Sequence, residues 1–381
     1  MNKKIISFIR QLYQTNADIP LHAPCFRGKE RQYVNDTIDS SFVSSVGQYV
    51  EQFEQRIEAF TGSGKAVATV NGTAALHLAL YMAGVRAGDL VITQPLTFVA
   101  TCNALYHLGA EPAFVDVSKD TLSLCPEALS RFLQHHASTD AHGCYLKNSG
   151  QRIRAVMPMH TFGHPAALDE LLQICQQWQL LLVEDAAESL GSFYKERHTG
   201  TLGKFAALSF NGNKIITTGG GGMLLCASIA DGMLARHLTT TAKVAHRWEF
   251  YHDEPAFNYR LPNLNAALGC AQMESLHFFL QQKRKIAMQY KAFFSGTDYQ
   301  FVDEPEHCSS NFWLNAIICP NQSSRDSLLQ STNDVGVMTR PVWQLMHHLP
   351  AFKEAIRGDL NCAEDMASRL VNLPSSVQES L

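Results

Sequence analysis

Four short segments of the sequence carry residues that could bind a ligand, and each follows a short apolar run. In the first, Asn71-Gly72-Thr73 brings small residues and free backbone amides to the start of an apolar helix, an arrangement that binds anions such as phosphate. A plain helix cap by Asn71 is the simpler explanation of these residues alone. In the second, Phe98 could stack on a flat ring, although a buried core phenylalanine is the simpler interpretation of a single aromatic residue.

The third segment ends an apolar run with two carboxylates, Glu184 and Asp185. An isolated carboxylate in a buried position is costly, so we expect a charged or hydrogen-bonded partner beside Asp185. That partner is either an arginine in a structural salt bridge or a cationic group of a ligand. The residues leave both alternatives open.

The fourth segment runs from Ser209 through Lys214 to four consecutive glycines, Gly219 to Gly222. Four glycines in a row carry a large cost in backbone entropy. A bulky ligand that needs the main chain to approach closely explains this cost. The alternative, a flexible surface loop, fits poorly between two apolar runs.

These segments lie within an alternation of short apolar runs and helical patterns that covers most of the chain. The runs are typical of buried strands, and they are Lys65–Val70, Leu90–Thr93, Ala113–Val115, Ile153–Pro158, Leu180–Val183 and Phe205–Phe210. Between two of them, Pro165–Trp178 has the apolar spacing of an amphipathic crossover helix. We therefore predict an α/β fold with a mostly parallel central sheet and helices on both faces. Ligands bind at the carboxyl ends of the strands in such a sheet, where all four segments begin.

The pattern changes from about Pro262 onward. A long helical stretch, Leu264–Tyr290, is followed by a predicted strand at Phe312–Cys319. We therefore predict a large α/β domain over residues 1–260 and a smaller C-terminal α+β domain over residues 261–381, on which the N-terminal segment can pack.

Composition excludes several classes of protein. The 381 residues are 46% hydrophobic and 17% charged, a globular balance, and no apolar run is long enough to cross a bilayer. The net charge of −4, without a basic tail or stripe, argues against a nucleic-acid partner. The ten cysteines form no C-x-x-C pair, and the first residues lack the apolar core of a signal peptide. We expect reduced thiols and a cytoplasmic protein.

Three familiar motifs are also excluded. Gly62-Ser63-Gly64-Lys65 is not a phosphate loop, because the first glycine of that motif is missing and Ala66 follows the lysine. No G-x-G-x-x-G follows the first strand, which argues against a nucleotide-dependent oxidoreductase. His160 and His164 are four residues apart but lie outside an H-E-x-x-H helix, so no metal site is predicted.

The order of the motifs along the chain is more specific than any one of them. The motifs are Asn71-Gly72-Thr73, Pro95-Leu96-Thr97-Phe98, Glu184-Asp185-Ala186-Ala187-Glu188, Ser209-Phe210-Asn211-Gly212-Asn213-Lys214, Phe257-Asn258-Tyr259-Arg260, Asn265-Ala266-Ala267-Leu268-Gly269 and Thr339-Arg340-Pro341. In this order they resemble the pyridoxal-phosphate-dependent nucleotide-sugar aminotransferases of the DegT/DnrJ/EryC1/StrS family, nearly from end to end. The resemblance implies the fold-type-I aminotransferase architecture and pyridoxal 5'-phosphate as cofactor.

The resemblance implies two catalytic residues. Lys214 matches the lysine that forms an imine with the cofactor and later moves a proton between two carbons. Asp185 matches the carboxylate that pairs with the pyridinium nitrogen and keeps the cofactor ring protonated. The cofactor would thus supply the cation expected beside Asp185.

The same resemblance implies cofactor contacts at five further positions. Gly72, Thr73 and Ser209 match contacts to the cofactor phosphate, and Phe98 matches the residue that stacks on the ring. Glu188 occupies a position on the ring side where many relatives carry glutamine or histidine.

Contacts across a subunit boundary and to the substrate are implied as well. Asn258 matches a residue that reaches the phosphate of the neighbouring subunit's cofactor, so a homodimer with shared active sites is expected. Candidate residues for binding the substrate, whose diphosphate needs local positive charge, are Lys243, Arg247, Arg260, Arg340 and His160.

The implied reaction is transamination of a nucleotide-linked sugar ketone, with glutamate as amino donor and 2-oxoglutarate as its product. Three segments resemble the branch that aminates UDP-linked 4-keto-6-deoxy-N-acetylhexosamines for legionaminic-acid-type sugars, and they are Leu21-His22-Ala23-Pro24, Phe42-Val43-Ser44-Ser45-Val46-Gly47 and Asn211–Gly219. Two alternatives within the fold are a sugar dehydratase, in which histidine replaces the lysine at 214, and a non-catalytic regulatory protein. The presence of Lys214 argues against both.

Overall fold

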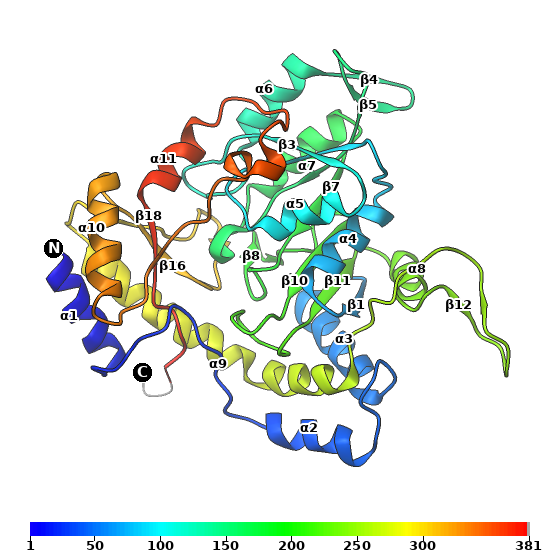
Figure 1. The fold of residues 1–381 in the computed structure, drawn as a ribbon, viewed down its shortest axis with the longest axis horizontal. Coiled ribbons are helices and arrows are strands. Elements are labelled where there is room, and N and C mark those ends of the chain that lie inside the picture. The colour runs from blue at the N-terminus through cyan, green and yellow to red at the C-terminus, as the bar shows by residue number, and fades with distance from the viewer. Residues whose placement is uncertain (379–381) are drawn as a thin grey trace.

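A nine-stranded sheet forms the centre of the computed structural model, which describes residues 1–378 (Figure 1). Seven strands run in the order β1-β11-β10-β7-β6-β2-β3, and the hairpin β4–β5 pairs onto β6. The neighbours from β10 to β3 along this order are all parallel, whereas β11 is antiparallel to β1 and to β10. The strands are β1 Lys65–Thr69, β2 Leu90–Thr93, β3 Glu111–Phe114, β4 Ala137–Asp140, β5 Gly143–Leu146, β6 Arg152–Met157, β7 Leu181–Asp185, β10 Phe205–Ser209 and β11 Gly222–Cys226. The predicted mostly parallel sheet is confirmed.

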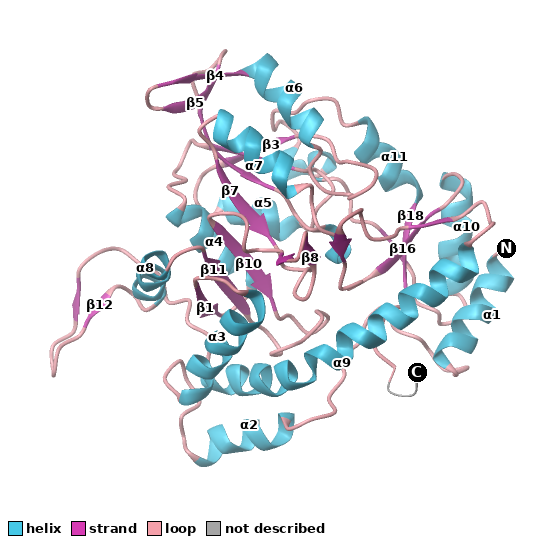
Figure 2. Cartoon of the chain, turned by 180° about the vertical axis from the view of Figure 1, so that it is seen from behind, coloured by secondary structure: helices cyan, strands magenta, loops and turns pink. Residues whose placement is uncertain are grey.

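Helices cover both faces of this sheet (Figure 2). Side chains alternate between the faces along each strand, because successive residues of a strand point to opposite sides. Ala206 and Leu208 of β10 pack with α3 and α9, whereas Ala207 packs with α4 and α8. The helices are α1 Asn2–Tyr13, α2 Glu30–Asp39, α3 Gln48–Thr61, α4 Gly72–Met82, α5 Val99–Tyr106, α6 Pro126–His136, α7 Leu168–Gln177, α8 Ile229–Thr239, α9 Asn263–Phe294, α10 Gln322–Asn333 and α11 Asn361–Arg369. None of the helices in residues 1–378 combines the length and apolarity of a membrane span.

A second, antiparallel sheet of four strands lies in the C-terminal third of the chain. Its strands, in spatial order, are β14 Gln300–Phe301, β16 Asn315–Ile318, β18 Leu370–Leu373 and β17 Arg340–Pro341. α9 passes from one core to the other (Figure 1): Phe279 packs against the large sheet, and Tyr290 packs with the N-terminal helix α1 and the small sheet. Because α9 belongs to both cores, the domain boundary at residue 260 stays a prediction.

The remaining strands are short. β8 Phe193–Tyr194, β9 Arg197–His198 and β15 Cys308–Ser309 form a three-stranded sheet. β12 Lys243–Val244 and β13 Tyr251–His252 pair in a hairpin, which we call the arm (residues 241–254). Both views show the arm extending away from the rest of the molecule (Figures 1 and 2).

The crossover helix begins later than predicted. α7 starts at Leu168 and not at Pro165, because the backbone N–H of Ala166 donates to His160 Nδ1 and Ala167 has a non-helical ψ of 73°. The long helix is extended at both ends relative to the prediction, to Asn263 and Phe294.

Candidate active site

The four segments predicted to bind a ligand meet at one cavity of about 320 Å³. The ends of β1, β2, β7 and β10 bring them together, since these four strands run in the same direction. The register also pairs Thr69 and Ser209 with the same residue, Gly222. The predicted residues that line the cavity are Gly72, Thr73, Phe98, Asp185, Glu188, Ser209 and Lys214.

The wall formed by α4 and β10 has no room for larger residues. Asn71 Oδ1 accepts a hydrogen bond from the backbone N–H of Ala74 at 2.7 Å, so Asn71 is indeed the cap of α4. A Cβ at Gly72 would lie 2.9 Å from the Cβ of Ser209. Gly72 therefore lets the first turn of α4, with its free amides, lie directly beside Ser209, which is a favourable site for an anion.

The glycine run is explained mainly by the packing of the chain on itself. A Cβ at Gly222 would lie 2.4 Å from the backbone of Asn71, and one at Gly221 would lie 2.2 Å from Thr218 Oγ1. Gly220 has no such neighbour within 4 Å and lines the cavity together with Gly221. The prediction of a ligand against the main chain thus concerns Gly220 and Gly221 and not the whole run.

Asp185 lies at the end of β7 and is 2% exposed. Its carboxylate accepts hydrogen bonds from Thr101 Oγ1 at 2.7 Å and from the backbone N–H of Ala187 at 3.2 Å. Burial raises its pKa, and these hydrogen bonds and the charge of Lys214 oppose that effect. Within residues 1–378 no cation forms an ion pair with Asp185. A salt bridge to an arginine is therefore excluded within these residues, and the carboxylate has hydrogen-bond donors but no cationic partner.

The partly buried Lys214 and the buried Glu188 form an ion pair that lines the cavity. Lys214 Nζ lies 3.2 Å from Glu188 Oε1 and 3.9 Å from the ring centroid of Trp313. Glu188 Oε2 accepts a second hydrogen bond from the backbone N–H of Phe162 at 2.9 Å. Burial raises the pKa of Glu188 to about 7, although the positive charge of Lys214 opposes the shift.

Aromatic side chains complete the cavity, and two of them were not predicted. Phe98 is 49% exposed, and its ring centroid lies 6.3 Å from that of Trp343. Trp313 is held by a hydrogen bond from its Nε1 to the carbonyl of Asn213 at 2.7 Å. Trp313 and Trp343 come from the C-terminal third of the chain, so their place at this cavity carries no local sequence signal. Thr101 did carry one, because it lies one helical turn after Phe98.

The structure places two of the predicted substrate contacts in buried pairs with carboxylates. His160 is fully buried, with Nε2 at 3.0 Å from Glu184 Oε2 and Nδ1 accepting from Ala166, so neither ring nitrogen is free for a substrate. Arg260 is 6% exposed and donates to Glu54 Oε1 at 2.5 Å. Each side chain pairs with a buried carboxylate, Glu184 for His160 and Glu54 for Arg260. A buried carboxylate without such a partner would be strongly destabilising.

The other predicted contacts lie outside this cavity. Lys243 and Arg247 belong to the exposed arm, where Lys243 lies over the ring of Phe250. Arg340 is exposed on β17 and donates to Asn333 Oδ1 at 2.8 Å. Asn258 is exposed and forms a β-bridge with Thr240. The structure does not bring these four residues to the cavity of their own chain.

Comparison with known proteins gives this cavity a chemical context. The model of the DegT/DnrJ/EryC1/StrS aminotransferase family matches residues 24–380, which is nearly the whole chain. The chain belongs to this family. Two curated relatives are GDP-perosamine synthase of Escherichia coli, 33% identical over 94% of this chain and 93% of the relative, and the putative pyridoxal phosphate-dependent aminotransferase EpsN of Bacillus subtilis, 35% identical over 94% and 90%. The protein is thus a sugar aminotransferase of the DegT/DnrJ/EryC1/StrS family.

Solved structures agree with the fold. The aminotransferase TlmJ of Streptoalloteichus hindustanus superimposes with a TM-score of 0.85 at 26% identity, over 96% of this chain and 95% of that one. A putative sugar aminotransferase of Streptococcus pneumoniae, in its PMP form, gives the same TM-score at 23% identity over 94% and 92%. The predicted fold-type-I architecture is therefore confirmed.

Aminotransferases of the DegT/DnrJ/EryC1/StrS family depend on pyridoxal phosphate, and the cavity fits that cofactor. Asp185 is a buried carboxylate without a cation, as a protonated pyridine ring requires. The close approach of Gly72 to Ser209 leaves backbone amides and a hydroxyl for a phosphate. Lys214 lines the same cavity as these two features.

Proposed function

We propose that this sugar aminotransferase transfers the amino group of glutamate to the 4-keto group of a UDP-linked 2-acetamido-2,6-dideoxyhexos-4-ulose. The observation that carries the proposal is that Lys214 and Asp185 line one cavity. The same cavity is lined by Gly72, Thr73 and Ser209, the residues proposed to bind the phosphate. The product, a 4-amino sugar, suits the synthesis of surface polysaccharides. In support, a Bacillus subtilis relative that is 33% identical over 73% of this chain is named a spore coat polysaccharide biosynthesis protein.

Each cavity residue has a proposed task. Pyridoxal phosphate, when bound, supplies an aldehyde that links to amines and a ring that accepts the electron pair of a broken C–H bond. Lys214 Nζ holds the cofactor between turnovers and, once displaced by the donor amine, carries the proton from the donor carbon. Asp185 holds the positive ring nitrogen, and Phe98 covers one face of the ring. Gly72, Thr73 and Ser209 bind the phosphate.

Glu188 is proposed to pair with Lys214 on the side of the cofactor ring. Its carboxyl group stays protonated up to about pH 7 in the folded protein, compared with an ordinary value of 4.5. Between these two values the folded state binds a proton that the unfolded state has lost, so stability falls as the pH rises. A shift of this size corresponds to about 3 kcal/mol between pH 4.5 and 7.

The variant Glu188→Gln tests this ionisation. Glutamine keeps the shape and the acceptor for the N–H of Phe162 but does not titrate, so we expect the variant to lack this loss of stability between pH 5 and 7. The measurement is the unfolding free energy of the cofactor-free wild type and variant across that range. Glu306→Gln, at a side chain that is 87% exposed, is the matched control and should parallel the wild type. Parallel curves for Glu188→Gln would contradict the assignment.

We further propose that Asn258 acts on the cofactor phosphate of a second subunit, so that the functional unit is a homodimer. Asn258 is exposed and lies outside the cavity of its own chain, which is what a contribution to a neighbour requires. A hydrogen bond to a charged group contributes about 1.5–3 kcal/mol, so Asn258→Ala should weaken cofactor binding roughly ten- to a hundredfold.

Mixing two inactive variants tests the sharing of sites. A heterodimer of Asn258→Ala and Lys214→Ala subunits contains one site with both defects and one with neither. We therefore expect activity to return on mixing at a cofactor concentration where each parent is inactive. Subunit exchange is verified independently, for example with differently tagged chains. Exchange without returning activity would place the action of Asn258 within its own chain or remove it.

The substrate itself is tested with a panel of 4-keto-6-deoxy sugars linked to UDP, GDP or dTDP, with glutamate as donor. The proposal of UDP rests on the segments that resemble the legionaminic-acid branch. GDP is the specific competitor, because the relative from Escherichia coli is named GDP-perosamine synthase. Preferential amination of the GDP-linked sugar would overturn the choice of UDP.

Three basic side chains outside the cavity are also part of the proposal. Lys243, Arg247 and Arg340 are proposed to meet the substrate diphosphate, with the two arm residues reaching it in a neighbouring subunit, and the location is proposed to be the cytoplasm. A regulatory protein or dehydratase would lack the transaminase half-reaction. A yellow protein that borohydride bleaches, with the cofactor fixed to Lys214, distinguishes the aminotransferase from both.

A further inference from the structure

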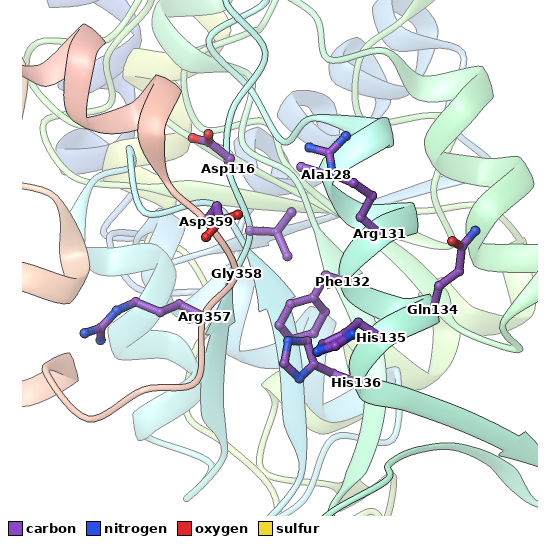
Figure 3. A pocket seen from close by; sticks show the side chains of 11 residues that line it. Asp116, Ala128, Arg131, Phe132, Gln134, His135, His136, Arg357, Gly358 and Asp359 are labelled. Carbon is purple, nitrogen blue, oxygen red and sulfur yellow. The ribbon is translucent and has the colours of Figure 1, made fainter.

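A second cavity lies away from the active-site cavity and shares no lining residue with it. It has a volume of about 810 Å³ and separates α6 from the segment 357–359, as Figure 3 shows. A neighbouring cavity of about 610 Å³ shares Arg357, Gly358 and Asp359 with it. The neighbouring cavity is also lined by three side chains, His347, His348 and Glu364, which the aminotransferase reaction does not use.

These three side chains converge on a single atom. His347 Nε2 lies 2.8 Å and His348 Nε2 lies 2.9 Å from the same carboxylate oxygen, Glu364 Oε1. The ligand atoms of all three residues lie within 4.8 Å of one another. Glu364 reaches the histidines from α11, seventeen residues after His347 in the chain. The convergence is therefore produced by the fold and not by local sequence.

Both elements that carry the cluster are fixed by backbone hydrogen bonds. The histidines lie on the 3₁₀ turn η2 (Met346–His348), where the N–H of Met346 donates to the carbonyl of Pro95 at 2.9 Å. At the start of α11, Asp116 accepts from the backbone N–H groups of Cys362 and Ala363. Side chains on anchored elements can form a metal site without large rearrangement.

We propose that His347, His348 and Glu364 bind a divalent transition-metal ion, with Zn²⁺ as the representative ion. Two imidazoles and one carboxylate are a common ligand set for such ions, and the open cavity leaves the fourth position to water. Around a tetrahedral Zn²⁺ with bonds of about 2.1 Å, neighbouring ligand atoms are about 3.4 Å apart. The present contacts of 2.8 and 2.9 Å need to open by only about half an ångström.

The surroundings of the cluster are compatible with a cation. Lys353 and Arg357 line the same cavity, but Arg357 Nη1 is occupied by the carbonyls of Lys353 and Ala355, and Asp359 adds a further negative charge.

The site connects α11 to the segment that forms part of the active-site wall. Trp343 of that wall lies three residues before Met346, at the start of η2. A metal ion held between η2 and α11 would restrain this segment from outside the cavity. We therefore assign the ion a stabilising role that is independent of the identity of the sugar substrate.

The test is Zn²⁺ binding to the pyridoxal-phosphate-loaded protein, measured by calorimetry and by the thermal unfolding midpoint. We expect one ion per chain and an increase of the midpoint for the wild type. His348→Ala and Glu364→Gln remove exposed ligands and should raise the Kd for Zn²⁺ by more than about tenfold. His135→Ala is the matched control, because it removes another exposed histidine that has a histidine neighbour but no place in the cluster.

Co²⁺ gives a second measurement that does not depend on stability. Bound by two imidazoles and a carboxylate, it should show visible d–d absorption in the wild type and in His135→Ala, and not in the two ligand variants. Circular dichroism verifies that the variants are folded. A wild type that binds neither ion, or binding that is unchanged in both His348→Ala and Glu364→Gln, would overturn the proposal.

Discussion

Replacing Lys214 with alanine is expected to lower the transamination rate by more than about 10⁴-fold, the upper range for the loss of a positioned general base. The loss should exceed that range because the same amine is also proposed to anchor the cofactor and to exchange with the donor amine. Its Nζ atom contacts Glu188 and Trp313 at the wall of the cavity, and among residues 1–378 no second lysine lines that cavity. Steady-state turnover and the half-reaction with glutamate measure the effect.

The fold should survive this substitution. The Lys214 side chain borders the cavity and not the packed core, and Glu188, which loses its partner, can remain protonated because its pKa is already about 7. Lys195→Ala is the matched control: Lys195 pairs with Asp169 on the surface, where such ion pairs contribute little. It should retain full activity. Near-normal turnover in Lys214→Ala would remove the central assignment of the site.

The location of the cavity could be predicted because the residues that follow parallel strands lie together at the same edge of the sheet. The predicted runs Lys65–Val70, Leu180–Val183 and Phe205–Phe210 correspond to β1, β7 and β10. The residues that follow these strands line one cavity in the structure. The alternation of short apolar runs with helical patterns also predicted that these runs form buried strands. Here local pattern and tertiary structure agree, so the cavity could be assembled before any coordinates.

Contacts between distant segments could not be predicted in this way. Arg260 was assigned to a substrate because its charge was visible, whereas its partner Glu54 lies 206 residues away. Trp313 and Trp343 reach the cavity only because the small sheet lies beside the large one. The cluster of His347, His348 and Glu364 was missed for the same reason, since nothing in the local spacing joins a histidine pair to a carboxylate on the next helix.

Asp185→Asn is expected to lower the rate of the glutamate half-reaction by about 10²–10³-fold, the usual cost of removing one preorganised charge from a reaction site. The asparagine has the same shape, and its oxygen can still accept a hydrogen bond from Thr101 or from the N–H of Ala187. What it lacks is the negative charge that we propose keeps a proton on the cofactor ring. The ring would then be neutral and would accept electrons poorly, so the chemical step should slow while binding of the phosphate is retained.

The position of Asp185 makes this effect separable from stability. Burial raises the pKa of the carboxyl group, so its charge is unfavourable without the cofactor. Removing that charge should stabilise the cofactor-free protein or leave it unchanged, while the half-reaction slows. Asp169→Asn, at an exposed carboxylate paired with Lys195, is the matched control and should keep the wild-type rate. The half-reaction is followed by the loss of the pyridoxal phosphate absorption in single turnovers with glutamate. Formation of pyridoxamine phosphate at the wild-type rate in Asp185→Asn would show that the ring nitrogen is protonated by another group, and the assignment of Asp185 would then be wrong.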